Sequence, residues 1–455
     1  MTDILSRSIA ELTRSDISPM ELVQAAFAQI GRCEPQLNAF ISLFHEESLR
    51  RAREIEAEMR RGENPGPLSG IPIAVKDIIH LAGTETTCGA KNAGSAVRNS
   101  AIDAAVIKRL KAAGAIIIGK TNLHEHAFGV TTENPHFGVT RNPWHTAHVP
   151  GGSSGGSGAA VAARFCAGAL GTDTGGSVRI PASLCGIVGL KPTFGRISVH
   201  GVVELAQSLD CIGPMCRTAQ DIAILMNVLT NDVPPVSDYT ADIGKPIAGM
   251  KVGLHKAHFF DNLDAEVEAA VEKAMQMLEE LGVEFIEVSM PSVPDAHAAA
   301  LTILMAEAAH FHREQLLARR EDYGADVREL LEAGLNLSAL DYVTAVRARD
   351  AARREFVEAF QKVDVLLTPA NPIPAPPISI GMESSNELRP RLTQETRIFN
   401  LLGLPAISVP CGFTEAGLPI GMQLAGAWWD EKRLIHIADA YQNATGWHRR
   451  LPPGP

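Results

Sequence analysis

Two serines framed by glycines stand inside apolar, core-forming sequence between residues 150 and 193. Ser153 lies in the run GGSSGG and Ser177 in the run TGGS. Glycines on both sides let the backbone approach a ligand closely and adopt conformations that other residues avoid. A serine held in such a turn can expose its hydroxyl beside several converging backbone N–H groups. Acyl transfer requires this combination of a nucleophile and an oxyanion hole.

A run of glycine and serine is also typical of flexible linkers. The sequence on either side argues against that interpretation. Residues 159–170 are small and apolar except for Arg164, which predicts a closely packed helix, and residues 186–190 read as a buried strand. Because a linker does not stand within core-forming sequence, this segment is predicted to form an active site.

Lys76 stands in a second informative segment, residues 71–79, which read IPIAVKDII. If this segment is a strand, successive side chains point to opposite faces, and both faces are mainly apolar. This pattern predicts a buried strand. Most lysines are solvated surface residues. A lysine inside this strand would be desolvated, its pKa would fall, and a neutral amine able to accept a proton would become accessible near pH 7.

These segments resemble the amidase signature family, the Ser–Ser–Lys hydrolases. The resemblance extends from about residue 18 to 445 and covers residues 70–77, 119–122, 151–156, 171–182, 189–193, 208–214, 367–369, 400–405 and 421–423. It implies an α/β fold, a single large α/β/α unit with a mixed central β-sheet surrounded by helices.

The resemblance also implies roles for individual residues. Ser177 would be the nucleophile and Lys76 the base, while Ser153, after a cis peptide bond that follows Gly152, would relay protons between them. The oxyanion would be held by backbone N–H groups of Thr174, Gly175, Gly176 and Ser177. Ser154, Thr172, Asp173 and Arg179 match supporting positions, although Asp173 and Arg179 could equally form a structural ion pair.

The implied activity is cleavage of a carboxylic amide or a related acyl C–N bond such as a carbamate (urethane), with ester cleavage as a side activity. The alternative is the glutaminase subunit of a tRNA-dependent amidotransferase, which residues 193–214 resemble closely. That subunit must hold the α-ammonium and α-carboxylate of glutamine, and the sequence offers no convincing acid and arginine pair for them. A free-standing amidase is therefore preferred, and a non-catalytic binding protein is disfavoured because all three reactive residues are present.

Three other patterns are rejected. Residues 114–121 fit the phosphate-loop pattern GxxxxGK[ST], but their middle is an apolar strand and Gly114 caps the helix predicted at residues 104–113. His124 and His126 lack the spacing and partners of a zinc site, and are expected beside the cleft or at the surface. Catalysis by a Ser-His-Asp triad has no support in the sequence. No cofactor or metal is expected. Trp428 and Trp429 could line a pocket mouth or pack near a strand end.

Composition restricts the partners. The formal net charge of −11 disfavours nucleic acid. The first thirty residues lack a signal-peptide pattern, and no apolar run of about 20 residues predicts a membrane span. Seven cysteines, an odd number, favour reduced thiols and a cytoplasmic location. The expected partner is a small-molecule amide or carbamate substrate, and the chain could also form a homodimer.

The signature elements are spread along the 455 residues, which favours one domain, residues 1–455. Within it we expect N-terminal helices at 1–62, the catalytic core at 63–220, a mostly helical pocket-shaping region at 262–362 and a return to the core at 363–445. Helices are predicted from a capping box at Ser18 to about residue 30 and at 46–61, 266–281 and 341–360. Residues 373–378 are predicted to be an extended loop.

Overall fold

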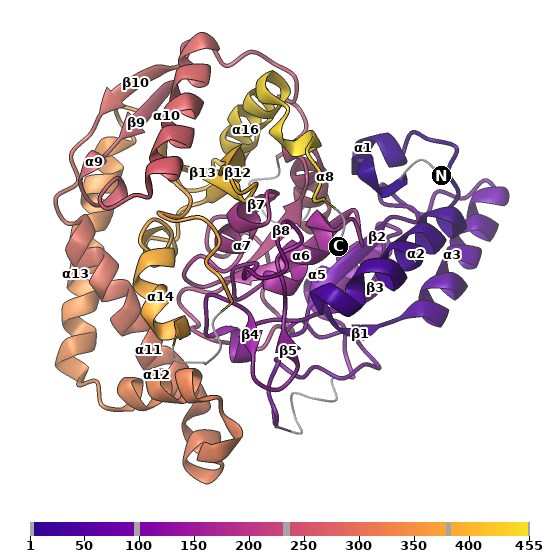
Figure 1. The fold of residues 1–455 in the computed structure, drawn as a ribbon, viewed down its shortest axis with the longest axis horizontal. Helices are drawn as coiled ribbons and strands as arrows, with labels where there is room; N and C mark the ends of the chain where they lie inside the picture. Colours follow the sequence, from indigo (N-terminus) through magenta and orange to yellow (C-terminus); the bar gives the residue numbers. More distant parts are fainter. Residues whose placement is uncertain (1–3, 95–100, 231–236, 379–383, 454–455) are drawn as a thin grey trace.

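An eleven-stranded mixed sheet runs through the computed structural model, which describes residues 4–94, 101–230, 237–378 and 384–453 (Figure 1). Its strands lie in the order β1-β3-β2-β6-β8-β7-β12-β13-β11-β9-β10. Their bounds are β1 (Phe40–Leu43), β2 (Pro72–Lys76), β3 (Ile116–Thr121), β6 (Gly168–Asp173), β7 (Val188–Lys191), β8 (Cys211–Cys216), β9 (Lys251–Leu254), β10 (Glu284–Glu287), β11 (Val365–Pro369), β12 (Ala406–Phe413) and β13 (Pro419–Gly426). A small separate ribbon pairs β4 (Glu133–Asn134) with β5 (Gly138–Val139).

The pairing mixes both strand directions. β2 lies parallel between β3 and β6, and β9 lies parallel between β10 and β11. The strands between these two groups pair antiparallel. β12, near the end of the chain, lies beside β7 from its first half, and β13 lies on the other side of β12. The sheet therefore joins distant parts of the sequence, and the predicted α/β fold with a mixed central sheet is confirmed.

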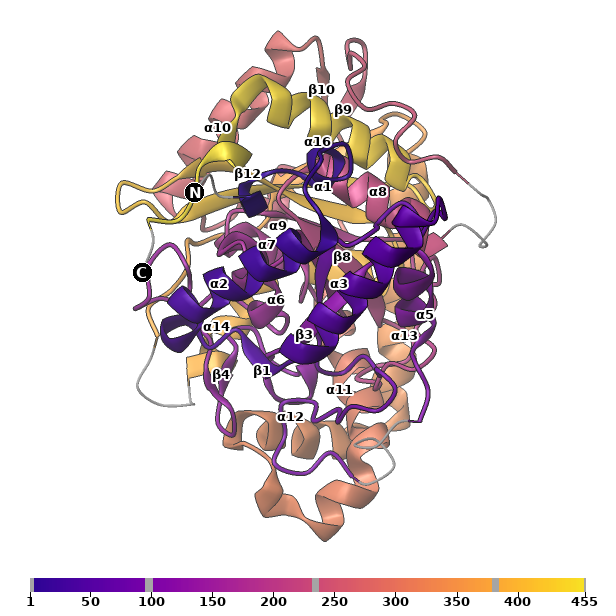
Figure 2. The same cartoon turned by 90° about the vertical axis from the view of Figure 1, so that its right-hand side faces the viewer.

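Helices cover both faces of the sheet (Figures 1 and 2). Their bounds are α1 (Ile9–Leu12), α2 (Pro19–Leu37), α3 (His45–Arg60), α5 (Ala105–Ala112), α6 (Gly155–Ala162), α7 (Arg179–Leu184), α8 (Ala219–Thr230), α9 (Lys256–Phe259), α10 (Ala265–Glu280), α11 (Val293–Ala318), α12 (Ala325–Leu335), α13 (Ala339–Ala359), α14 (Ser384–Leu392), α15 (Arg397–Leu401) and α16 (Glu431–Thr445).

The residues of β2 explain how the two layers form. Ile73 and Val75 pack into the core that includes α5 and α8, whereas Ala74, between them, packs with α2, α3 and α6. Successive side chains of a strand point to opposite faces, so an apolar residue at every position requires cover on both sides. The whole strand is buried, as its sequence predicts. Lys76 is its last residue.

The predicted helices are present with shifted ends. Ser18 caps α2 through both halves of a capping box, but α2 continues to Leu37, beyond the predicted end near residue 30. The other three predicted helices correspond to α3, α10 and α13. Region 262–362 is mostly helical and also contains the strand β10. Residues 373–378 form the predicted loop.

The single helix predicted at residues 159–170 is wrong. α6 covers only its first part, and β6 begins at Gly168. The chain leaves the helix at Arg164, whose φ of 61° lies in the left-handed region. A left-handed residue after the last turn ends a helix. The small apolar residues that follow are therefore part of a buried strand, which carries Asp173 at its end.

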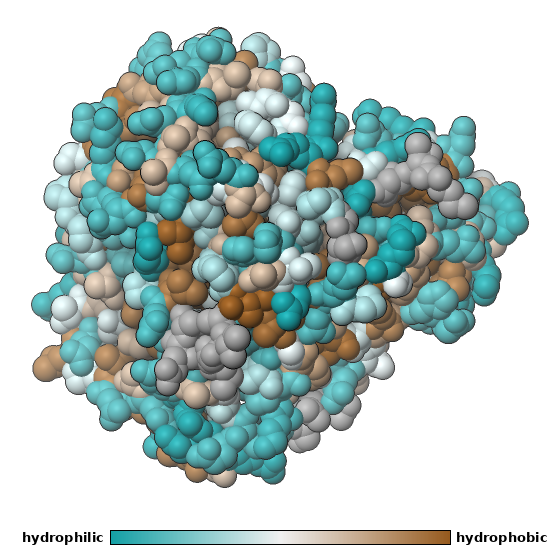
Figure 3. Space-filling model, in the orientation of Figure 1, coloured by the Kyte–Doolittle hydropathy of each residue, from teal (hydrophilic) through white to brown (hydrophobic). Residues whose placement is uncertain are grey.

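The surface is mainly polar. On the face shown in Figure 3, hydrophilic residues predominate at the periphery and hydrophobic residues occur in small patches nearer the middle. Among the described residues, no helix has the length and apolar character needed to cross a membrane. All seven cysteines are buried and none forms a disulfide.

Candidate active site

Lys76 is fully buried at the end of β2, where its amine meets three hydroxyl groups. The distances from Nζ are 2.7 Å to Ser153 Oγ, 3.0 Å to Ser154 Oγ and 2.9 Å to Thr172 Oγ1. Burial lowers the pKa of Lys76 to about 7, opposed by the negative charges of Asp210 and Asp173. A large share of the amine is therefore neutral near pH 7 and able to accept a proton.

Ser153 and Ser154 stand just before α6, at the point where the glycine-rich loop enters the core. The peptide bond between Gly152 and Ser153 is cis. A Cβ atom at Gly152 would lie 2.8 Å from the backbone nitrogen of Thr131, so only glycine fits there. The Ser154 N–H donates to the Ser177 carbonyl at 3.2 Å, which ties the two serine loops together.

Asp173 organises the loop that carries Ser177. Its carboxylate accepts the N–H groups of Gly176 at 2.8 Å and Val178 at 3.1 Å. Arg179 binds the same carboxylate through Nε at 3.0 Å and Nη2 at 2.8 Å. These charge-assisted bonds hold the pKa of Asp173 well below its usual range, against the effect of burial. The pair is both a buried ion pair and a support for the loop.

Arg179 also connects this loop to the C-terminal part of the chain. It donates to the Thr396 carbonyl at 2.9 Å, to Gln423 Oε1 at 2.7 Å and to Asn400 Oδ1 at 2.7 Å. Thr396 precedes α15, and Gln423 belongs to β13. The Ser177 loop is therefore positioned by segments that lie more than 200 residues away in the sequence.

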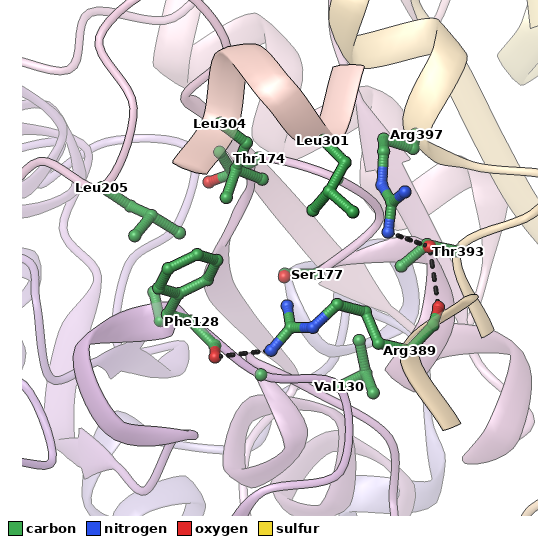
Figure 4. A pocket seen from close by; sticks show the side chains of 13 residues that line it. Phe128, Val130, Thr174, Ser177, Leu205, Leu301, Leu304, Arg389, Thr393 and Arg397 are labelled. Atoms are coloured by element: carbon green, nitrogen blue, oxygen red, sulfur yellow. Dashed lines mark hydrogen bonds between the residues drawn. The ribbon is translucent and has the colours of Figure 1, made fainter. Parts of the chain in front are cut away.

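The Ser177 hydroxyl faces a small pocket (Figure 4). The volume of this pocket is about 20 Å³, which is enough for a water molecule, so side chains must move when a substrate binds. The pocket is lined by Ala127, Phe128, Gly129, Val130, Thr174, Gly175, Ser177, Leu205, Leu301, Leu304, Arg389, Thr393 and Arg397. In the described residues no hydrogen bond joins the Ser153 and Ser177 hydroxyls.

Most of the residues singled out from the sequence lie together. Lys76, Ser153, Ser154 and Thr172 are in direct contact, and Thr174, Gly175 and Ser177 line the pocket. Gly152, Gly176, Asp173 and Arg179 support the two loops. The Gly176 N–H already donates to Asp173.

The histidines and tryptophans take structural positions. His124 is buried against Asp326, with Nε2 2.7 Å from Oδ2. The His126 ring meets the His312 ring edge to face, with the ring centroids 4.4 Å apart. Both are buried, so the surface position considered for them is wrong, and the adjacent Ala127 and Phe128 line the pocket. Trp428 donates to the Leu402 carbonyl at 2.9 Å, two residues after β13. Residues 116–121 form β3, not a phosphate loop.

Sequence reasoning missed three charged residues of the site. Asp210 is half-buried beside the Ser177 loop, where it accepts a hydrogen bond from the Thr174 hydroxyl at 2.6 Å. Arg389 and Arg397 reach the pocket from α14 and α15. Asp210 lies in segment 208–214, which is part of the family resemblance, but the sequence analysis assigned this residue no role. Nothing in the local sequence distinguishes Arg389 and Arg397 from surface arginines.

Comparisons of the sequence and of the structure with known proteins point to the same family. The amidase family model matches residues 21–435. A protein of Carboxydothermus hydrogenoformans that bears the name of a glutamyl-tRNA(Gln) amidotransferase subunit is 40% identical over 97% of both chains. A solved amidase structure has a TM-score of 0.88 at 34% identity, covering 96% of this chain and 99% of the other. The solved structure of the glutamyl-tRNA(Gln) amidotransferase subunit of the same name from Thermotoga maritima has a TM-score of 0.84 at 35% identity, covering 100% and 99%.

Proposed function

Because the chain belongs to the amidase signature family, we propose that it cleaves a carboxylic amide through an acyl-enzyme on Ser177, with Lys76 as base and Ser153 as proton relay. The observation that carries the proposal is the buried Lys76 amine, 2.7 Å from Ser153 Oγ and with a pKa lowered to about 7. A base with a pKa near the working pH is efficient in proton transfer.

The reaction starts when neutral Lys76 takes the Ser153 proton while Ser153 takes the proton of Ser177. The Ser177 oxygen then attacks the amide carbonyl. The oxyanion accepts hydrogen bonds from the backbone N–H groups of Thr174, Gly175 and Ser177. The Gly176 N–H is left out of this set because it already donates to Asp173. The proton returns through Ser153 to the leaving amine, and the C–N bond breaks. Water finally hydrolyses the ester on Ser177.

A second candidate is the glutaminase component of an amidotransferase complex. The full-length relatives at about 40% identity carry the name of an amidotransferase component, which favours this candidate over the free-standing amidase preferred from the sequence. The pocket residues argue against it. The charged side chains among them are Arg389 and Arg397, which suit an α-carboxylate but leave an α-ammonium without a counter-charge. Both candidates share the chemistry at Ser177.

The first experiment tests that shared chemistry. The purified chain is mixed with aliphatic and aryl amides, carbamates, esters and glutamine, and the acyl-enzyme is followed by intact mass. We expect Ser177→Ala to lose both turnover and the mass adduct, whereas Ser198→Ala, outside the pocket, keeps them. More than a few per cent of activity in Ser177→Ala would contradict the assignment of the nucleophile.

The same substrate panel separates the two candidates. A free-standing amidase hydrolyses a non-glutamine amide as the purified single chain. A glutaminase component hydrolyses glutamine, and does so faster when co-purified with further protein components. Hydrolysis of glutamine alone among the amides would therefore favour the second candidate and would overturn the free-standing amidase.

A further inference from the structure

Two arginines stand on one side of the pocket that the Ser177 hydroxyl faces. Arg389 comes from α14 and Arg397 from α15, and their exposed fractions are only 6% and 4%. In Figure 4 the guanidinium of Arg389 lies close to Ser177, with that of Arg397 on the neighbouring wall. Two buried cations beside a nucleophile are costly unless a negative charge compensates them.

Neither arginine has a carboxylate partner at ion-pair distance among the described residues. Arg389 donates to the Phe128 carbonyl at 3.0 Å and to Asn386 Oδ1 at 3.3 Å, and its Nε is buried without an acceptor. Arg397 donates to Thr393 Oγ1 at 2.5 Å and lies 3.4 Å from His297 Nε2. Arg179, by contrast, is fully buried and paired with Asp173. The pocket arginines therefore retain the capacity to bind an anion.

Both guanidiniums stay charged near neutral pH. Burial lowers the pKa of Arg389 to about 10, opposed by the charges of Asp326 and Glu329. Burial and then the nearby charge of Arg389 lower the pKa of Arg397 to about 9. His297 is neutral at pH 7, because burial and the charge of Arg397 lower its pKa to about 3. An anion between the two arginines would relieve their repulsion.

The rest of the pocket lining is mainly apolar and includes Leu205, Leu301 and Leu304 (Figure 4). We propose that Arg389 and Arg397 form an anion subsite that holds a carboxylate of the substrate while Ser177 attacks its amide. Ser177 and both arginines line the same small pocket, so the carboxylate and the amide are separated by a short chain. The substrate class is the monoamide of a small dicarboxylic acid. This inference rests on the proposed function and specifies its substrate.

The kinetic test uses malonamate, succinamate and glutaramate beside the corresponding neutral diamides. We expect kcat/KM to be roughly 30-fold or more higher for the best anionic amide than for its diamide, since a buried charge pair contributes at least that much. Arg389→Met and Arg397→Met should each reduce that ratio towards one. Arg320→Met changes an exposed arginine and should leave the ratio unchanged. A wild-type ratio near one would overturn the inference.

A binding measurement tests the anion subsite without requiring catalytic activity. Malonate, succinate and glutarate are titrated into Ser177→Ala protein by calorimetry, with glutaramide as the neutral control. We expect at least one dicarboxylate to bind and glutaramide not to bind, and the double variant Ser177→Ala/Arg397→Met to lose the dicarboxylate. Equal binding of glutaramide would overturn the anion subsite while leaving hydrolysis at Ser177 intact. Activity that survives Ser177→Ala would instead overturn the proposed function.

Discussion

At the scale of single residues, the neighbours of a buried lysine decide what it can do. Lys76, Lys120 and Lys191 are all fully buried. Lys120 forms an ion pair with Asp77 at 2.6 Å, and Lys191 donates to the Pro192 carbonyl at 2.8 Å. Lys76 faces three neutral hydroxyl groups, those of Ser153, Ser154 and Thr172. Burial without a carboxylate partner makes a neutral, proton-accepting state accessible to Lys76.

The pH dependence of catalysis tests the role of Lys76. Its pKa is lowered to about 7, so the neutral base accumulates as the pH rises through that value. We expect kcat/KM to rise with pH along a limb near pH 7. Lys76→Ala should lose this limb and roughly 10²–10⁴ in rate. Lys76→Arg should be no better, because guanidinium stays protonated. An unchanged profile in Lys76→Ala would assign the base to another group.

Asp210 provides an independent test of the same electrostatics. Its charge is the largest influence that keeps the pKa of Lys76 from falling further. Burial raises the pKa of Asp210 to about 6, so it is mostly ionised at pH 7. Removal of a negative charge beside a cation lowers the pKa of that cation. The kcat/KM limb of Asp210→Asn should therefore move to lower pH. A limb that stays at the same pH would show that Asp210 does not act on Lys76.

At the scale of elements, α6 depends on close contact between backbones. A Cβ atom at Gly156 would lie 2.3 Å from the Asn122 carbonyl oxygen and 2.5 Å from that of Ala39. Glycine in a helix is normally unfavourable by about 0.5–1 kcal/mol relative to alanine. Here the lack of a side chain lets α6 approach the segments that follow β3 and precede β1. The serine loop before α6 is placed by this approach.

We expect Gly156→Ala to lower the free energy of unfolding, although alanine favours helices, because backbone atoms cannot move aside for the new methyl group. Gly31→Ala in α2 is the matched control. A Cβ atom there meets nothing within 4 Å, so this variant should be more stable by about 0.5–1 kcal/mol. Urea denaturation midpoints of the two variants should move in opposite directions. Equal stabilisation by both would show that α6 does not need the close approach.

At the scale of the whole molecule, the order of strands links the two halves of the chain. β12 and β13 lie between β7 and β11, and Arg179 joins the Ser177 loop to α15 and β13. Few segments can therefore separate without breaking the sheet. We propose that residues 1–455 unfold as one cooperative unit.

Two probes of urea unfolding test this proposal. Far-ultraviolet circular dichroism follows the helices of the whole chain, and fluorescence follows Trp144, Trp428, Trp429 and Trp447. The two transitions should coincide if one unit unfolds. Substrate analogues that bind at Ser177 should shift both together. Separate midpoints, or an early transition of the helical region 262–362 alone, would divide the chain into smaller units.

The local sequence determined much of the fold and of the reactive centre. Apolar residues at every position predicted that β2 is buried on both faces, and the glycine frames marked Ser153 and Ser177 as residues in tight loops. Capping chemistry located the start of α2, because Ser18 and Glu21 satisfy local N–H groups. Such features depend on residues a few positions apart, so they can be read from the chain alone.

Only the tertiary structure decided the rest. α6 ends at residue 162 although the apolar pattern continues, because residues from Gly168 onwards pair with neighbouring strands as β6. The contact of Lys76 with three hydroxyls, and the gathering of Asp210, Arg389 and Arg397 around the Ser177 loop, join segments up to 321 positions from Lys76. Charge and burial act through space, so a residue's role in this pocket depends on which distant groups the sheet brings beside it.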